Sequence, residues 1–489
     1  MNRVSVARFL YTGTLFVLTG MAVPPLTSVA PTLPKTTPAH DAPANQKATL
    51  SDNYLDGVVE GFYGPRWSVT NTDTILKFLS VHHLTAFIYA PKDDPYQRVK
   101  WNLLYPPAQL QYLSQIIRTA QTLKITFIYS LSPGLSIHYN NPSDLAALLR
   151  KINQIKALGV NTFMLSFDDI PTTGNLYTLA VEQSHLANEV LQSESKTTPD
   201  FRLLFTPTIY WGTTSNPYWQ GLKQALNPNI DVLWTGPEVL SPTITLKDAE
   251  AAKEGIGHPL VIWDNYPVND YTYDQPPYHP HLFLGPVVGR SSNLPGVLAG
   301  YFFNPMLQAV ASEPALWTGA AYLSNPSDYH PANVWTQALR SIGAGAPNAF
   351  MLFADANVSS YLGYPSQIPL ATLIRHFWGG YQKGLIAYFQ NMAGADNTMT
   401  LHLINRPLLN EIQPWLTLYS SEGKAGLYAI ALLHDKQQKK GVPLTAVSAL
   451  AMRARSISTS PYSLDTTPLT LQFLHQALTR LGYSASIQP

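Results

Sequence analysis

The 489-residue chain contains no cysteine. This absence excludes disulfide bonds, thiol nucleophiles, zinc sites with cysteine ligands and a cysteine-linked lipid anchor. It does not decide the compartment, because exported bacterial proteins often lack cysteine too.

Charge is also scarce, at 12% of residues, which is about half the usual share. The formal net charge of +1 predicts no broad attraction to nucleic acid or to an anionic membrane. By contrast, 45% of residues are hydrophobic and 27 are tyrosines. Many aromatic residues beside few charges suit a neutral ligand with apolar faces, such as a sugar.

Long apolar runs are confined to the N-terminus. Arg3 and Arg8 precede the stretch FLYTGTLFVLTGMAV, and the small residues Ser28-Val29-Ala30 follow it. This pattern predicts a signal peptide over residues 1–30, and so a secreted or extracytoplasmic protein without membrane attachment after cleavage. An uncleaved membrane anchor is the alternative. Residues 31–50, rich in Pro, Thr and Ala, are predicted to be a flexible linker.

Eight short apolar runs alternate with amphipathic segments between residues 54 and 305. The predicted strands are 57–64, 85–90, 125–134, 162–169, 202–210, 231–236, 259–265 and 296–304. The predicted helices between them are 71–83, 107–123, 142–158, 178–195, 217–226 and 245–255. This order predicts an α/β fold, a (β/α)8 TIM barrel over residues 51–340. A doubly wound sheet is the alternative, disfavoured because no Gly-rich phosphate fingerprint follows any strand.

The pattern becomes helical after about residue 325. Helix-like spacing covers residues 331–343, 368–393, 407–420, 424–435 and 468–481. We therefore predict an α-helical C-terminal domain over residues 345–489. Its mildly basic stretch is interpreted as a solvated face and consists of Lys436, Lys439, Lys440, Arg453 and Arg455.

A barrel places its active site at the C-terminal ends of the strands. In this sequence, those ends carry unusual polar and aromatic residues. They are Glu60, Tyr63, Lys92, Asp93, Asp94, Asp168, Asp169, Tyr210, Trp263, Asp264, Asn265 and Asn304. Their recurrence at one end of several strands predicts a site there.

The stretch FMLSFDDI ends an apolar run with Asp168 and Asp169. Neighbours in a strand point to opposite sides, so both can face a ligand only where the backbone turns. Ile170 precedes a proline and avoids helical angles, which predicts that the strand stops there. Two close carboxyl groups split their pKa values, giving an acid beside an anion, as acetal hydrolysis requires.

Adjacent carboxyl groups differ from those of ordinary retaining glycosidases, which lie about 5–5.5 Å apart across the sugar. They suit a substrate that supplies its own nucleophile, as a 2-acetamido sugar does through its carbonyl oxygen. Helix capping by an aspartate is one alternative. A metal site completed by Asp93 or Asp94 is another. The histidines at 82, 83, 279 and 281 show no convincing metal spacing.

Six stretches together resemble glycoside hydrolase family 84, the β-N-acetylglucosaminidases that include protein O-GlcNAcases and enzymes called hyaluronidases. They are GVVEGFYGPRWS, YAPKDDPYQRVKW, FMLSFDDI, VIWDNYPVND, LFLGPVVGR and the strand that ends at Asn304. They occur in family order over residues 54–305. The resemblance implies a barrel that hydrolyses terminal β-linked GlcNAc by substrate assistance, in exo fashion, with retention and without a metal or other cofactor.

The resemblance also implies roles for nine residues. Asp168 would polarise the acetamide nitrogen, and Asp169 would act first as general acid and then as base. The remaining roles concern sugar binding: Tyr210 near the acetamide carbonyl, Trp263 as the wall of the methyl pocket, Asn265 on the acetamide side, Asp270 at O4 and O6, and Asn304, Lys92 and the Gly61 carbonyl at other hydroxyls. Asp264 would point away into a structural hydrogen bond, with Glu60 and Asp93 in supporting positions.

Two other functions stay open at this point. One is an endo-acting, hyaluronidase-type glycosidase, which an Asp270 grip on O4 would disfavour. The other is a non-catalytic GlcNAc-binding protein, which has no need for two adjacent carboxyl groups. For the exo-acting enzyme, the expected partner is a carbohydrate with terminal β-GlcNAc, carried on a glycoprotein, a glycan or a cell-wall fragment.

Overall fold

The structure is a computed structural model and describes residues 53–172, 174–273 and 279–483. These residues belong to one compact unit. The predicted signal peptide and linker lie outside the described residues. Across the described part of the chain, no helix combines the length and apolar character needed to cross a membrane.

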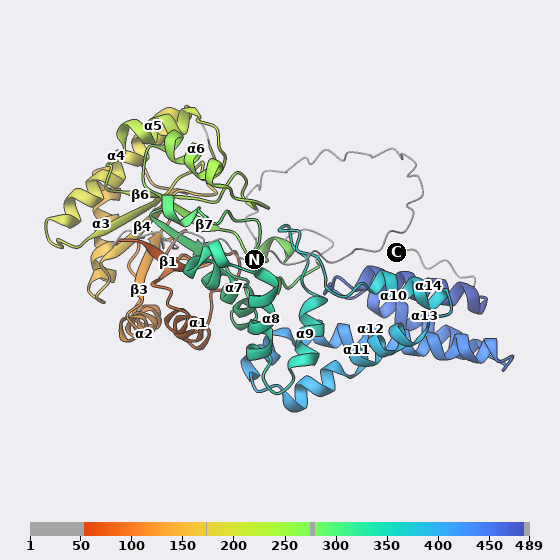
Figure 1. Ribbon diagram of the computed structural model, residues 1–489. Coiled ribbons are helices and arrows are strands. Elements are labelled where there is room, and N and C mark those ends of the chain that lie inside the picture. Colours follow the sequence, from red (N-terminus) through yellow and green to blue (C-terminus); the bar gives the residue numbers. More distant parts are fainter. Residues whose placement is uncertain (1–52, 173, 274–278, 484–489) are drawn as a thin grey trace, which may run out of the picture. The chain divides into compact units, whose positions relative to one another are not determined.

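Eight parallel strands close into a barrel in the order β1 to β8, with β8 paired to β1 (Figure 1). They are β1 Leu55–Glu60, β2 Ala86–Tyr89, β3 Thr126–Leu131, β4 Thr162–Ser166, β5 Arg202–Thr206, β6 Asp231–Trp234, β7 Leu260–Asp264 and β8 Gly300–Phe303. Closure confirms the predicted barrel and excludes the doubly wound sheet. Several strands end earlier than predicted, because their last polar residues lie in the loops that follow.

Helices separate most of the strands, with side-chain caps that explain where several of them begin. They are α1 Val69–Val81, α2 Pro107–Thr122, α3 Pro142–Lys156, α4 Leu176–Ser195, α5 Pro217–Ala225 and α6 Leu246–Ile256, and α7 Glu313–Ser324 follows the last strand. Ser68, Asn141 and Asn175, for example, each accept a hydrogen bond from a backbone N–H in the first turn. The link between β7 and β8 holds two 3-10 helices, η1 Asp270–Tyr273 and η2 Pro295–Val297.

The barrel interior is filled by every second residue of the strands, as the two-residue period of a strand requires. The interior cluster consists of Leu55, Val59, Ala86, Ile88, Ala90, Ile128, Met164, Leu204, Leu233, Val261, Trp263 and Phe302. The larger apolar cluster takes the alternate strand residues together with the helices. The strands are therefore buried on both faces.

A second group of helices follows the barrel and confirms the predicted helical C-terminal region. It comprises α8 Pro331–Ile342, α9 Pro347–Asp355, α10 Leu370–Trp378, α11 Lys383–His402, α12 Arg406–Gln437, α13 Leu444–Ser458 and α14 Thr467–Leu481. α12 packs against α11, α13 and α14 (Figure 1). α8 packs against both α7 and α9. The predicted domain boundary near residues 340–345 therefore lies within a continuous series of packed helices and stays a prediction.

The helix predictions were wrong in detail in this region. The predicted helix 368–393 is two helices, α10 and α11, separated at Gly379 and Gly380. The predicted helices 407–420 and 424–435 are one helix, α12. α7, α9 and α13 were not predicted. α7 is buried over most of its length and so lacks the one-sided apolar stripe that reveals a surface helix.

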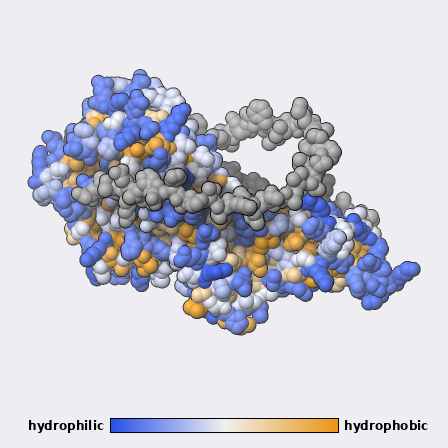
Figure 2. Space-filling model, in the orientation of Figure 1, coloured by the Kyte–Doolittle hydropathy of each residue, from blue (hydrophilic) through white to orange (hydrophobic). Residues whose placement is uncertain are grey.

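The surface agrees with the charge-poor composition. On the face in Figure 2, apolar residues are interspersed with hydrophilic ones. The five basic residues interpreted as a solvated face are indeed exposed: Lys436, Lys439, Lys440, Arg453 and Arg455.

Candidate active site

The site is built on the inward-facing register of the strands. Five predicted site residues continue that register beyond the strand ends. They are Gly61 after Val59, Lys92 after Ala90, Asp168 after Met164 and Ser166, Asn265 after Trp263, and Asn304 after Phe302. The same alternation that fills the barrel therefore directs polar groups to its C-terminal mouth.

Asp168 is buried, with 6% of its surface exposed, and forms an ion pair with the equally buried Lys92. Burial alone would raise the pKa of Asp168, but the charges of Lys92 and Arg98 and the hydrogen bond from Lys92 bring it below its ordinary value. Its Oδ1 is buried without a hydrogen-bond partner in the described structure. Asp168 is thus an anion with one oxygen left to accept a hydrogen bond.

Asp169 lies in a different environment, although it is the next residue. β4 has ended at Ser166, and Asp169 has a φ of 51°, in the left-handed region. This turn lets its side chain depart from the strand alternation and reach solvent. Tyr63 Oη donates to one carboxylate oxygen at 2.9 Å, and Tyr210 Oη donates to the other at 2.8 Å.

The two tyrosines stay protonated. Burial, followed by the nearby charge of Asp169, raises the pKa of both Tyr63 and Tyr210 far above the ordinary value of a phenol. Both phenols are therefore neutral, and each contacts Asp169 through a hydrogen bond.

Hydrogen bonds to asparagine amides hold the indole of Trp263, the predicted wall of the methyl pocket. Trp263 Nε1 donates to Asn265 Oδ1 at 2.9 Å, and Asn304 Nδ2 donates to the same oxygen at 2.9 Å. Gly61 N donates to Asn304 Oδ1 at 3.2 Å. Lys92 Nζ lies 5.4 Å from the centre of the Trp263 ring. These contacts join the ends of β1, β7 and β8 to the ion pair at β2 and β4.

Gly61 packs directly against the indole of Trp263. A Cβ at residue 61 would lie 2.1 Å from Cζ2 of that ring, which is far inside contact distance. Only glycine fits this position without moving the wall.

Tyr63 also connects Asp169 to Asp270. Its backbone N–H donates to Asp270 Oδ2 at 2.7 Å, while its hydroxyl contacts Asp169. The structure thereby brings all nine predicted site residues into one connected network. The roles assigned to them in sugar binding and catalysis stay predictions at this point.

Asp264 points away from the site, as predicted. It accepts hydrogen bonds from Arg290 at 2.6 and 2.8 Å and from Tyr301 Oη at 2.5 Å. Glu60 is fully buried and accepts from the Trp67 N–H at 2.8 Å. Both carboxyl groups therefore support the strand ends.

The metal alternative gains no support from the neighbouring aspartates. Asp94 already accepts hydrogen bonds from the hydroxyls of Tyr89 at 2.7 Å and Tyr105 at 2.8 Å, and it forms an ion pair with Arg66. Asp93 is exposed. Among the described residues, no group of three or more histidines and carboxylates is arranged to hold a metal ion.

Two residues near the aspartates were missed by sequence reasoning. Tyr63 was noted only as an unusual strand-end residue, and Arg98 was quoted in YAPKDDPYQRVKW without a role. Arg98 Nη2 donates to the backbone carbonyl of Asp169 at 2.9 Å. Loop residues of this kind carry no periodicity, so the only available signal was their place within a specific motif.

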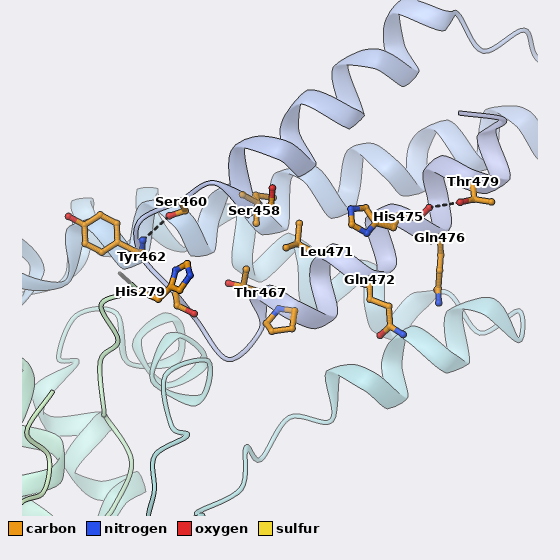
Figure 3. Close-up of a pocket in the computed structure, with 13 residues that line it drawn as sticks. His279, Ser458, Ser460, Tyr462, Thr467, Leu471, Gln472, His475, Gln476 and Thr479 are labelled. Carbon is orange, nitrogen blue, oxygen red and sulfur yellow. Dashed lines mark hydrogen bonds between the residues drawn. The ribbon is translucent and has the colours of Figure 1, made fainter. Parts of the chain in front are cut away.

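A separate hollow of about 660 Å³ lies among the C-terminal helices (Figure 3). It is lined by His279, by the end of α13, by the loop that follows α13, including Tyr462, and by α14, including Gln472 and His475. None of the nine predicted site residues lines it, so it is distinct from the carboxylate site.

A closed parallel barrel that carries two adjacent aspartates at its C-terminal mouth, beside a tryptophan hydrogen-bonded to an asparagine amide, has the architecture of a glycoside hydrolase-type barrel. A sequence model described as beta-N-acetylglucosaminidase matches residues 56–355. The chain belongs to this family, glycoside hydrolase family 84.

Curated relatives include the rat and mouse proteins named protein O-GlcNAcase. The Rattus norvegicus protein is 35% identical over 323 residues, which cover 63% of this chain and 34% of the relative. The Mus musculus protein is 36% identical over 287 residues, which cover 56% and 30% respectively. The chain thus spans about a third of the length of these relatives.

Solved structures resemble the chain over most of its length. The structure of CpGH84B has a TM-score of 0.74 and 28% identity, covering 87% of this chain and 77% of that one. A point mutant of the Thermobaculum terrenum O-GlcNAc hydrolase has a TM-score of 0.77 and 28% identity, covering 87% and 95%.

Proposed function

We propose that the protein is an exo-acting, retaining β-N-acetylglucosaminidase that removes terminal β-linked GlcNAc by substrate-assisted catalysis. The observation that carries this proposal is the contrast between the two aspartates. Asp168 is a buried anion paired with Lys92, and Asp169 is exposed between two tyrosine hydroxyls. Membership of a β-N-acetylglucosaminidase family supports the same activity.

In the first step, the acetamide carbonyl oxygen of the sugar attacks the anomeric carbon, and the bond to the leaving oxygen breaks. Asp169 gives its proton to that oxygen. The acetamide N–H becomes acidic as the oxazoline-type intermediate forms, and the free Oδ1 of Asp168 accepts its hydrogen bond. An anion already fixed at this place stabilises the positive charge that develops.

In the second step, a water molecule attacks the anomeric carbon and Asp169 accepts its proton. The acetamide is released and the β configuration is restored after two inversions. Trp263 buries the acetyl methyl group, for which an aromatic face is favourable. Asp270 accepts hydrogen bonds from O4 and O6, which leaves no room for a further sugar there and makes the enzyme exo-acting.

The test is a panel of aryl glycosides with purified protein. The N-acetylglucosaminide is hydrolysed, the N-acetylgalactosaminide more slowly, and the glucoside with a 2-hydroxyl group is nearly inert. EDTA has no effect. Brisk turnover of the glucoside would overturn substrate assistance, and tight sugar binding without turnover would favour a non-catalytic binding protein.

Two substitutions test the roles of the aspartates. Asp168→Asn and Asp169→Asn each lower kcat by about 10²-fold or more, in line with the usual contribution of an acid–base group. Added azide rescues only Asp169→Asn with an activated leaving group, because that carboxylate alone acts on water. The exposed Asp328→Asn is the control and keeps wild-type rates.

We also propose that the protein is exported and meets its sugar outside the cytoplasm. The support is the basic and apolar pattern of residues 1–30 with Ser28-Val29-Ala30. Fractionation of cells that produce the whole chain, with N-terminal sequencing of the extracytoplasmic form, tests this. Recovery of the uncut chain in the cytoplasm would overturn it.

A further inference from the structure

Asp169 has an uncommon backbone conformation that must be held in place. A φ of 51° is costly for residues other than glycine, by about 1 kcal/mol, although aspartate tolerates it better than most. A return to extended angles would restore the strand alternation and point the Asp169 carboxyl group to the side opposite Asp168. The proposed proton transfer therefore depends on whatever fixes this peptide.

Arg98 is the side chain that contacts this peptide. Its Nη2 donates to the Asp169 carbonyl oxygen at 2.9 Å. Arg98 is 5% exposed, and its guanidinium carbon lies 5.8 Å from the centre of the Tyr63 ring, whose hydroxyl contacts the Asp169 carboxylate. One arginine thus contacts both the backbone of Asp169 and one of the two residues that hold its side chain.

The loop that carries Arg98 is firmly anchored. The preceding residue, Gln97, is fully buried and donates to Ser130 and Ser132 at the end of β3. The Ser132 N–H donates back to the Gln97 carbonyl at 2.9 Å. Asp94, also buried, is fixed by the tyrosine hydroxyls described above. Arg98 is therefore a rigid support whose own position does not depend on the substrate.

We infer that Arg98 is a positioning residue for the general acid: its guanidinium holds the left-handed peptide of Asp169 so that the carboxyl group faces the leaving oxygen. This inference rests on the proposed function. Nη1 of Arg98 is buried without a hydrogen-bond partner in the described structure, so a single donor carries the contact. A lysine that reaches the same carbonyl should therefore replace it in part.

The experiment compares two N-acetylglucosaminides, one with an activated nitrophenyl leaving group and one with a simple alkyl leaving group. Only the alkyl group requires protonation as it departs. Arg98→Gln is expected to lower kcat/KM for the alkyl substrate about 10²-fold and for the activated substrate only a few-fold. Arg98→Lys recovers part of the loss.

Controls separate positioning from other effects. Arg118→Gln removes an exposed arginine from α2 and changes neither rate. In an Asp169→Asn background, Arg98→Gln adds little, because the group that it positions is already absent. If Arg98→Gln does not fold, Arg98→Met keeps the apolar stem against Tyr63 and serves in its place.

The outcomes are distinguishable. An equal loss on both substrates indicates a structural role, or one through Asp168, and overturns the inference; so does the absence of any loss. If the wild-type protein hydrolyses neither substrate, the proposed function fails and the assignment of Arg98 fails with it. Wild-type turnover with a loss confined to the alkyl substrate supports both.

Discussion

At the scale of single residues, the pairing of Lys92 with Asp168 decides the charge of the site. Lys92→Met leaves a buried carboxylate without its partner, a change that costs about 3–5 kcal/mol unless the group takes up a proton. Burial then acts unopposed and raises the pKa of Asp168. We expect kcat/KM to fall at least about 10²-fold.

The pH profile identifies the cause of that loss. In the wild type, the lowered pKa of Asp168 keeps it ionised down to acidic pH, so activity persists there. In Lys92→Met, the acidic limb of kcat/KM moves to higher pH. Lys77→Met, at an exposed position of α1, is the control. Profiles of the same shape for Lys92→Met and the wild type would contradict this account.

Gly61 offers a second residue-scale prediction. Because the new Cβ would lie 2.1 Å from the indole, Gly61→Ala must displace Trp263. Misplacement by about 1 Å lowers kcat/KM by about 10²-fold. Steady-state kinetics measures the loss of activity, and circular dichroism checks that the variant still folds. Gly441→Ala, where a Cβ meets no atom within 4 Å, keeps wild-type activity. An active Gly61→Ala enzyme would show that the wall is not essential.

The direction of a site side chain could be predicted best where the two-residue period of a strand applies. Asn265 and Asn304 lie two residues beyond interior side chains, so their direction follows from the period of two. Asp169 breaks that period through its left-handed φ, which the sequence indicated only as a turn before Pro171. Arg98 approaches from a loop between elements, and no local pattern predicts where such a side chain points.

At the scale of elements, the strands and the first six helices followed from their apolar patterns and caps. The bounds of the C-terminal helices did not follow, because these helices pack against one another and bury residues that a local sequence pattern assigns to the surface. The predicted helices 407–420 and 424–435 left residues 421–423 between them, yet α12 is continuous there. Gly423 lies against the α11 backbone, and Glu422 is buried against threonine hydroxyls. Tertiary contacts, which a local pattern does not reveal, explain both residues.

The α11–α12 contact gives an element-scale prediction with a matched control. A Cβ at Gly423 would lie 2.4 Å from the Ala393 nitrogen, so Gly423→Ala separates the helices and costs about 1–3 kcal/mol. Gly394→Ala, on the facing helix α11, meets nothing within 4 Å and gains about 0.5–1 kcal/mol of helix stability. Urea denaturation measures both. Shifts in the same direction would refute the packing argument.

At the scale of the whole molecule, buried and half-buried glutamates are spread over the barrel and the C-terminal helices. Burial raises the pKa of Glu60 and Glu313 to about 8 and that of Glu411 and Glu422 to about 7. Glu411 also joins the two regions, since it lies on α12 and accepts from the Ala311 N–H at 2.9 Å. The protonation of these groups therefore couples the stability of both regions to pH.

Glu422 allows the sign of this coupling to be tested alone. An unfolded glutamate ionises near pH 4.5, whereas Glu422 keeps its proton in the folded state up to about pH 7. Between these values the folded state binds more protons, so its contribution to the free energy of unfolding falls as pH rises. Hydrogen bonds from Thr466, Thr467 and Thr470 lower the pKa but do not outweigh burial.

Glu422→Gln keeps the shape of the side chain and one acceptor oxygen for the threonine hydroxyls but removes the titration. Relative to the wild type, the variant should gain stability between pH 5 and pH 8, by up to about 3 kcal/mol. Urea unfolding at pH 5, 6, 7 and 8 measures the free energy of unfolding of both proteins. The titration of every other group cancels in the difference between them. A constant difference would mean that Glu422 titrates alike in both states, whereas a difference of the opposite sign would mean that its three threonine partners outweigh its burial.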